Sequence, residues 1–196
     1  AFAFSTTNIG SFGFNFYYSQ FTQGLNRLHP SILGNETTVS LRKTIDLGKI
    51  LAAKGFSVNF GNALYHPHQG HLTPVIKSNP FSHKGTDGMV VYGCVIVDDG
   101  SGKLDVVKYD TDPMMPMMVM KEVGTIDYSG GIITVGARFE PQISAGLGYG
   151  ITITAKPKNQ DLFVRENRII RINRGYSDSV SLSLETETTS KAASNT

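Results

Sequence analysis

Two short apolar segments on either side of a glycine-rich turn constrain this chain more than any other feature. Residues 89–97 (MVVYGCVIV) are apolar throughout, and residues 103–109 (KLDVVKY) follow the turn at residues 98–102 (DDGSG). Asp bonds to nearby backbone and Gly tolerates positive φ, so both suit a tight turn. The pattern predicts an antiparallel β-hairpin whose first strand is covered on both faces.

A second hairpin is predicted further along the chain. Residues 123–127 lead into a turn at residues 128–131 (YSGG), and residues 132–139 alternate with a period of two. This alternation places four apolar side chains on one face: Ile133, Val135, Ala137 and Phe139. Hairpin turns join neighbouring antiparallel strands, so we expect mainly antiparallel sheets.

Further period-two segments indicate more strands, at residues 56–60, 151–153, 168–173 and 179–185. The pattern thus predicts about seven or eight short strands. One short helix is expected within residues 44–55, where Asp46 can cap it, Leu47, Ile50 and Leu51 follow helical spacing, and Gly55 can end it. The predicted fold class is mainly β, at the margin of α+β.

The chain divides into three parts by composition. Residues 1–25 form an aromatic and glycine-rich N-terminal arm in which Phe12, Phe14 and Phe16 alternate as in a strand. An arm this apolar must pack on its own domain, on a preceding domain or on a partner chain. Residues 26–185 form the β-rich assembly domain, and the polar residues 186–196 form a flexible C-terminal tail.

Charge and cysteine content narrow the classes of partner. Only 17% of residues are charged and the net charge is +2, against a typical charged fraction of about 25%. The four arginines within residues 165–174 are interleaved with isoleucines, so we predict no nucleic-acid partner. No apolar stretch approaches the roughly 18 residues that span a membrane. Cys94, the only cysteine, lies in an apolar segment and is predicted to be buried and inert.

A proline- and histidine-rich loop is predicted at residues 65–83, and it carries the only cluster of candidate metal ligands. His66, His68 and His71 lie within six residues (HPHQGH), and three imidazoles can hold Zn²⁺ while leaving a position for water. However, the loop contains no carboxylate, and Pro67 restricts how the first two rings converge. We therefore favour a surface loop with no metal and no other cofactor, and keep the three histidines as weak candidates.

Other patterns that suggest chemistry are better explained by structure. The acidic turn at residues 98–102 lacks the spacing and the distal Glu of a calcium loop. Gly146, Gly148 and Gly150 (GLGYG) resemble a dinucleotide fingerprint, but no helical pattern follows, so a strand entry is favoured. The chain has no Gly-x-Ser-x-Gly segment. No catalytic residues are predicted, and the protein is not expected to be an enzyme.

Two groups of apolar residues are candidates for protein contacts. The first is a methionine-rich segment, with Met114, Met115, Met117 and Met118. Thioether side chains adapt their shape to a partner, so a contact surface is favoured over a soft-metal site. The second group is Phe12, Phe14 and Phe16 of the arm.

Four segments in a fixed order carry a family resemblance. Phe60-Gly61-Asn62 and Ser78-Asn79-Pro80-Phe81 precede Tyr92–Tyr109 (YGCVIVDDGSGKLDVVKY), which is followed by Val123–Pro141 (VGTIDYSGGIITVGARFEP). This order, over about residues 56–141, resembles the C-terminal region of the large ring-forming baseplate wedge subunit of T4-like contractile-tailed bacteriophages. The methionine-rich segment and the histidine-rich loop depart from the family pattern.

The resemblance implies a non-enzymatic role in a virus particle. The chain would be a structural subunit of the tail baseplate, assembled in the host cytoplasm. It would form a homodimer or ring, contact other wedge subunits, and carry no cofactor or catalytic residue. Low charge and exposed apolar segments agree with a permanent contact, because obligate interfaces are large and hydrophobic.

Two other functions remain open from the residues alone. A β-sandwich recognition module that binds a saccharide or another surface ligand would need exposed aromatic rings on a groove, and the absence of Trp argues mildly against it. A zinc hydrolase that uses His66, His68 and His71 would require one bound metal ion per chain.

Overall fold

The computed structural model describes residues 15–28, 35, 37–46, 48, 50, 55–68, 73–84, 88–109, 116–136, 139, 141–142 and 150–163. Within them lie one bounded helix, α2 (Tyr18–Asn26), and ten strands. The strands are β1 (Leu41–Asp46), β2 (Phe56–Asn59), β3 (Ile76–Ser78), β4 (Phe81–Lys84), β5 (Val90–Asp98), β6 (Lys103–Lys108), β7 (Met117–Asp127), β8 (Ile132–Val135), β9 (Pro141–Gln142) and β10 (Gly150–Ala155). The predicted mainly β fold class is confirmed.

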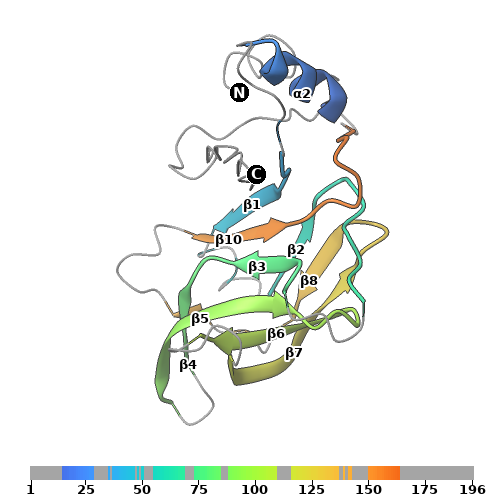
Figure 1. Ribbon diagram of the computed structural model, residues 1–196. Coiled ribbons are helices and arrows are strands. Elements are labelled where there is room, and N and C mark those ends of the chain that lie inside the picture. The colour runs from blue at the N-terminus through green and yellow to red at the C-terminus, as the bar shows by residue number, and fades with distance from the viewer. Residues whose placement is uncertain are drawn as a thin grey trace, which may run out of the picture.

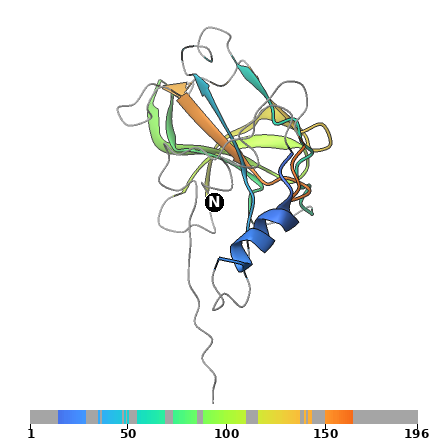
Figure 2. The ribbon, with the colours of Figure 1, turned by 90° about the horizontal axis from the view of Figure 1, so that it is seen from above.

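The strands form one antiparallel sheet that curls into a nearly closed barrel (Figures 1 and 2). Its order is β1-β10-β3-β5-β6-β7-β8-β2, and β4 pairs with β5 and with the two-residue strand β9. The two ends of this order, β1 and β2, face one another. The Lys43 ammonium of β1 donates a hydrogen bond to the Asn59 carbonyl of β2 over 2.7 Å. A side chain thus ties the two edges together.

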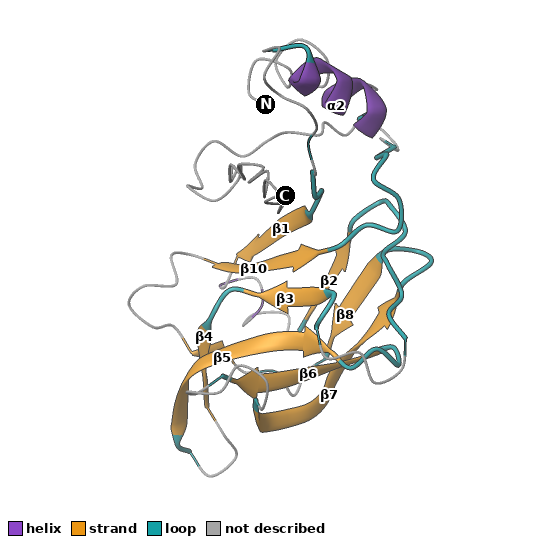
Figure 3. Cartoon of the chain, in the orientation of Figure 1, coloured by secondary structure: helices purple, strands orange, loops and turns teal. Residues whose placement is uncertain are grey.

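The core fills the inside of the barrel with alternate residues of its strands. Val58, Ile133 and Ile126 are successive partners across β2, β8 and β7, and all three are buried. Ile96 of β5 and Ile153 of β10 are fully buried in the same core. Both predicted hairpins, β5–β6 and β7–β8, are confirmed in this arrangement (Figure 3). The alternation in the sequence therefore predicted the inward face of β8 correctly.

Strand β5 is covered on both faces along only part of its length. Residues 94–98 are buried, as predicted, but Tyr92 is 67% exposed and the preceding Met89 is 69% exposed. Gly93, with φ +74°, separates the two parts. Strand β6 ends at Lys108, opposite Cys94, so the first part of β5 extends beyond β6 on one edge while it pairs with β4 on the other. The prediction of full burial was wrong for this part.

The helix predicted within residues 44–55 is present at the residues after Asp46 that the structure describes. Residues through Asp46 belong to β1, where Leu41–Asp46 pairs with β10 along its whole length. Gly48 and Ile50 are helical, and Ile50 is buried in the barrel core. The Gly55 amide donates to the Ile50 carbonyl over 3.3 Å, and Gly55 has φ +137°. The glycine stop is therefore confirmed, while Leu47 and Leu51 lie outside the described residues.

Helix α2 was not predicted from the aromatic arm. Its own N-cap residue, Tyr17, makes no capping hydrogen bond. The cap comes instead from Asp161, whose carboxylate accepts from the Tyr18 amide over 2.8 Å. A carboxylate is favourable at a helix N-terminus, where backbone amides lack partners. This helix, the longest described, spans only nine residues, and none of the described helices is long and apolar enough to cross a membrane.

Several other predictions differ from the structure or lie outside the described residues. The loop predicted at residues 65–83 contains β3 and the start of β4, and the methionine-rich segment enters β7 at Met117. The predicted strands at residues 168–173 and 179–185, and the tail at residues 186–196, lie outside the described residues.

A bulge in β7 leads to a stability prediction. Glu122 has φ +52°, a left-handed conformation that costs a non-glycine residue about 1–2 kcal/mol. Its amide donates to the Asp105 carboxylate over 2.7 Å, which holds the bulge in place. We expect Glu122→Gly to raise the free energy of unfolding by about 0.5 kcal/mol after the entropy of the added glycine is offset. Chemical denaturation measures this difference.

The control for this prediction is Glu122→Ala. It retains the strained φ and removes only the ion pair with Lys103, which spans 3.6 Å between exposed side chains and contributes little. Equal stability of the two variants would mean that the backbone strain at residue 122 is no larger than the entropic cost of the glycine, about 0.5–1 kcal/mol.

Candidate functional site

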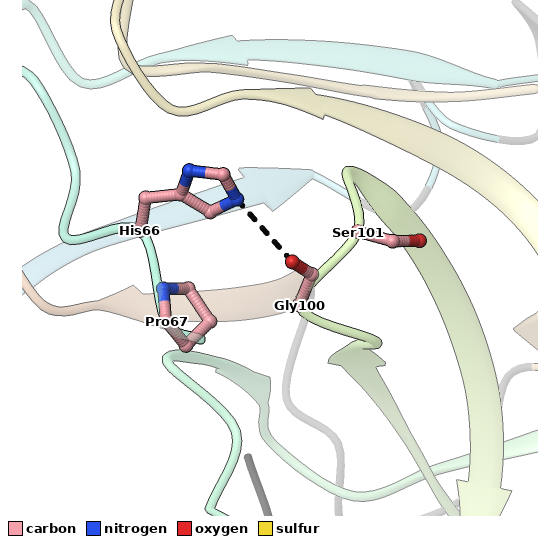
Figure 4. A pocket seen from close by; sticks show the side chains of 4 residues that line it. All are labelled: His66, Pro67, Gly100 and Ser101. Carbon is pink, nitrogen blue, oxygen red and sulfur yellow. Dashed lines mark hydrogen bonds between the residues drawn. The ribbon is translucent and has the colours of Figure 1, made fainter. Parts of the chain in front are cut away.

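The histidine-rich loop meets the turn of the β5–β6 hairpin. The His66 ring stacks on Tyr128, with centroids 4.4 Å apart and planes inclined by 21°. Its Nε2 atom lies 3.3 Å from the Gly100 carbonyl oxygen. His66, Pro67, Gly100 and Ser101 line an open hollow of about 310 Å³ (Figure 4).

The hollow does not bring a nucleophile to a base. In Figure 4 the Ser101 hydroxyl points away from His66, and it hydrogen-bonds the Asp99 carboxylate instead. His68 is exposed, and His71 lies outside the described residues. Among the residues that the structure describes, no three His, Cys, Asp or Glu side chains are grouped to hold a metal ion. The described part of the loop therefore presents one histidine that is engaged by stacking and by a backbone carbonyl.

Beneath the hollow, the buried Asp98 carboxylate joins three parts of the chain. Its Oδ1 atom accepts from the amides of Val75 and Ile76 over 2.7 and 2.8 Å. Its Oδ2 atom accepts from the Tyr128 hydroxyl over 3.0 Å. Burial and, next, the nearby Asp98 charge raise the pKa of Tyr128 well above its ordinary value. Tyr128 therefore stays a neutral donor at any ordinary pH.

The two hairpin turns are closed by aspartates of a similar kind. Asp127 accepts from the Ser129 hydroxyl over 2.7 Å and from the Gly130 amide over 2.9 Å, and these bonds lower its pKa. Partial burial acts to raise the pKa of Asp99, but hydrogen bonds from Ser101 and Lys103 outweigh it and hold that pKa below its ordinary value. Both carboxylates are thus used by their own turns, which was predicted for the acidic turn at residues 98–102.

The segments that carry the family resemblance hold turns and strand ends of the barrel in place. Gly131 has φ +68°, and a Cβ atom added to it would overlap the backbone carbonyl group of Asn62. The Gly131 carbonyl accepts from the Phe60 amide over 2.9 Å. Tyr128, from the same turn, reaches Asp98. Phe60-Gly61-Asn62 and the GTIDYSGG element therefore meet at one end of the barrel.

The Ser78-Asn79-Pro80-Phe81 segment forms the corner between β3 and β4. The Ser78 hydroxyl accepts from the Ile96 amide over 2.9 Å. The Asn79 side chain accepts from the Thr152 amide over 2.7 Å, and the Asn79 amide donates to the Thr152 carbonyl over 2.9 Å. These bonds extend the β-ladders where β5 changes its partner from β4 to β3. The segment has a structural role in turning the chain.

Exposed apolar side chains gather at the opposite end of strands β5 and β7. Met117 and Met118 are 47% and 44% exposed at the start of β7. Met117 pairs with Lys108, which pairs with Cys94 of β5, only two residues from the exposed Tyr92. We call Met89, Tyr92, Met117 and Met118 the apolar end. The predicted contact residues Met114 and Met115 lie outside the described residues.

The exposure of Tyr92 and Met89 was not predicted from the sequence. Both lie in the segment that we expected to be covered on both faces. Their exposure depends on where β6 ends, and Lys108, a charged residue opposite Cys94, was the available indication of that end.

Two other candidates have different surroundings from those expected. Phe16 packs against Phe21 and Leu162 within its own chain and is 8% exposed, while Phe12 and Phe14 lie outside the described residues. Gly150 opens β10 and lies so close to the Ile45 carbonyl that a Cβ atom would overlap it. This agrees with a strand entry, and Gly146 and Gly148 lie outside the described residues.

The comparisons with known proteins add no relative to this description. No protein-family model matches the chain, and a search of curated proteins gives no match.

Proposed function

We propose that this domain is a structural subunit of a contractile-tail baseplate wedge that joins neighbouring copies and other wedge subunits, and that it is not an enzyme. The observation that carries the proposal is the apolar end. Large side chains that are 44–69% exposed in one region of a small barrel are typical of a protein contact. Methionine is well suited to such a contact, because its flexible thioether fits irregular surfaces.

The roles of the resemblance segments support the same proposal. Ser78, Asn79, Tyr128 and Gly131 hold turns and strand ends in place. Residues that a family shares for such reasons set the shape of a subunit rather than a reaction. A subunit of fixed shape is what a symmetric particle requires, since its interfaces must close with a defined geometry.

Replacing the two methionines of β7 by lysine tests the contact. We expect Met117→Lys with Met118→Lys to raise the dissociation constant of self-association about tenfold or more, since burying two charges in an apolar interface costs at least the 1.4 kcal/mol that a tenfold change represents. Sedimentation equilibrium over a range of concentrations measures this constant, and zinc content is assayed on the same sample.

The matched control adds the same charges at the other end of β7. Thr125 and Ser129 are exposed there, and Thr125→Lys with Ser129→Lys should leave association unchanged. A wild-type chain that stays monomeric, or a methionine variant that associates like wild type, would contradict the proposal. So would a stable monomer with one zinc ion per chain. The place in the virion is tested by antibody labelling of the baseplate on purified tails.

A further inference from the structure

Helix α2 belongs to a small unit with its own hydrophobic cluster. The cluster consists of Phe16, Phe21 and Leu162, separate from the barrel core, and Leu41 at the start of β1 contacts both. We call residues 15–28 with Asn35 the helix unit and residues 161–163 the strap. Figures 1 and 2 show α2 outside the barrel, beside the chain that follows β10. The helix unit is thus attached to the domain rather than built into it.

Each residue of the strap holds a different part of the helix unit. Leu162 and Phe16 exchange two backbone hydrogen bonds of 2.9 Å as an isolated antiparallel bridge. Asp161 caps α2 through the Tyr18 amide. The Phe163 ring meets Tyr17 edge to face, with centroids 6.5 Å apart. The strap therefore presents a backbone edge, a carboxylate and an aromatic ring that together recognise this one helix.

The helix unit is also held together internally. The Asn35 side-chain amide donates to the Asn26 side-chain oxygen over 2.6 Å and to the Thr22 carbonyl over 3.3 Å. Asn35 therefore remains with α2. The chain leaves the unit through residues 37–40, which have no regular structure and of which Val39 packs against the same cluster, before β1 begins. A change of path at these residues would move the helix unit as a whole.

We propose that, in the assembled protein, the helix unit of one copy binds the strap of a neighbouring copy. The segment that binds the strap is known, because the strap contacts the helix unit of its own chain. A second copy supplies the same backbone bridge, cap and aromatic contact, so the exchange requires no new surface and is a low-cost route to association. The inference rests on the proposed assembly function, since a fixed neighbour supplies the high local concentration that favours exchange.

Disulfide trapping between two different variants tests the exchange. Beside the Phe16–Leu162 bridge, Asn15 and Phe163 face one another in the antiparallel register, with Cα atoms expected about 4.5 Å apart, within the roughly 4.4–6.8 Å that a disulfide spans. Chains carrying Asn15→Cys are mixed with chains carrying Phe163→Cys and oxidised. We expect a covalent heterodimer at twice the 21.3 kDa chain mass on a non-reducing gel. The native Cys94 is buried and stays in every variant.

Two controls separate exchange from collision and from misfolding. Ser19 lies exposed on α2, so Ser19→Cys chains mixed with Phe163→Cys chains should give several-fold less heterodimer. The double variant Asn15→Cys with Phe163→Cys should close within one chain when diluted, which establishes that the geometry allows the bond. If the double variant closes but the mixture gives no more heterodimer than the Ser19 control, the exchange is excluded. Unchanged wild-type association in sedimentation would then leave the proposed function standing.

Discussion

Replacing Asp98 by alanine should destabilise the domain by about 3 kcal/mol, measured by chemical denaturation. Three buried or partly buried donors would lose their acceptor: the amides of Val75 and Ile76 and the Tyr128 hydroxyl. A hydrogen bond contributes about 1 kcal/mol net, and a buried donor left unpaired costs as much again or more. The loss should be large because, among the described residues, the Asp98 carboxylate is the group that joins these three segments.

Two matched variants distinguish lost hydrogen bonds from lost charge. Asp98→Asn keeps an oxygen for the two amides, and its own amide can donate to the Tyr128 hydroxyl, so we expect a loss of about 1 kcal/mol or less. Tyr128→Phe removes only the hydroxyl and should also cost about 1 kcal/mol. If Asp98→Asn destabilised the domain as much as Asp98→Ala, the carboxylate charge, rather than its geometry as an acceptor, would be the stabilising feature.

Replacing Gly131 by alanine should have an effect of similar size. Its φ of +68° costs a residue with a Cβ atom about 1 kcal/mol. In addition, a methyl group there would overlap the carbonyl oxygen and carbonyl carbon of Asn62, which are backbone atoms that cannot rotate away. We expect a total loss of about 3 kcal/mol in the free energy of unfolding, in the range of overpacked sites.

Gly88 provides the control for this prediction. It has a similar φ of +80°, but no atom lies within 4 Å of the position that a Cβ would occupy. Gly88→Ala should therefore lose only the conformational contribution of about 1 kcal/mol. Equal losses in the two variants would mean that the turn at residues 128–131 moves away from Asn62 without cost.

The parts of the fold that could be predicted are those with local information. The β5–β6 hairpin is indicated by two apolar segments on either side of an Asp- and Gly-rich turn. The β7–β8 hairpin is indicated by alternation after a Gly-rich turn. Strands β1, β3 and β4 are short and mostly polar (LRKTID, IKS and FSHK). They become strands because of partners far along the chain, such as β10 for both β1 and β3. No local pattern contains that information.

Helix α2 illustrates the same limit. Its sequence (YSQFTQGLN) has a single buried residue, Phe21, with Tyr18 and Leu25 partly buried beside it at helical spacing. Its cap and its packing surface come from Asp161 and Leu162, more than 130 residues later in the chain. A prediction from nearby residues could therefore find neither the start of the helix nor its position.

The candidate site divides in the same way. The turn role of Asp99 follows from residue type and neighbours, and was predicted, whereas the turn role of Asp127 was not. From the sequence, Asp98 was interpreted as a turn residue. Its buried role was not predicted, because its partner Tyr128 lies 30 positions away. The exposure of Tyr92 likewise depends on the length of the neighbouring strand β6, which residue type alone does not give.

The Lys43–Asn59 bond gives the barrel a direction of weakness under mechanical load. Around most of its circumference, adjacent strands share ladders of backbone hydrogen bonds that are loaded in parallel when the wall is stretched. Between β1 and β2 the described residues show a lysine side chain in that place. A tensile force around the circumference would therefore part the wall at this seam first, and the sheet would open there while its ladders stayed intact. A pull on the wall from outside would thus strain the domain along one defined line.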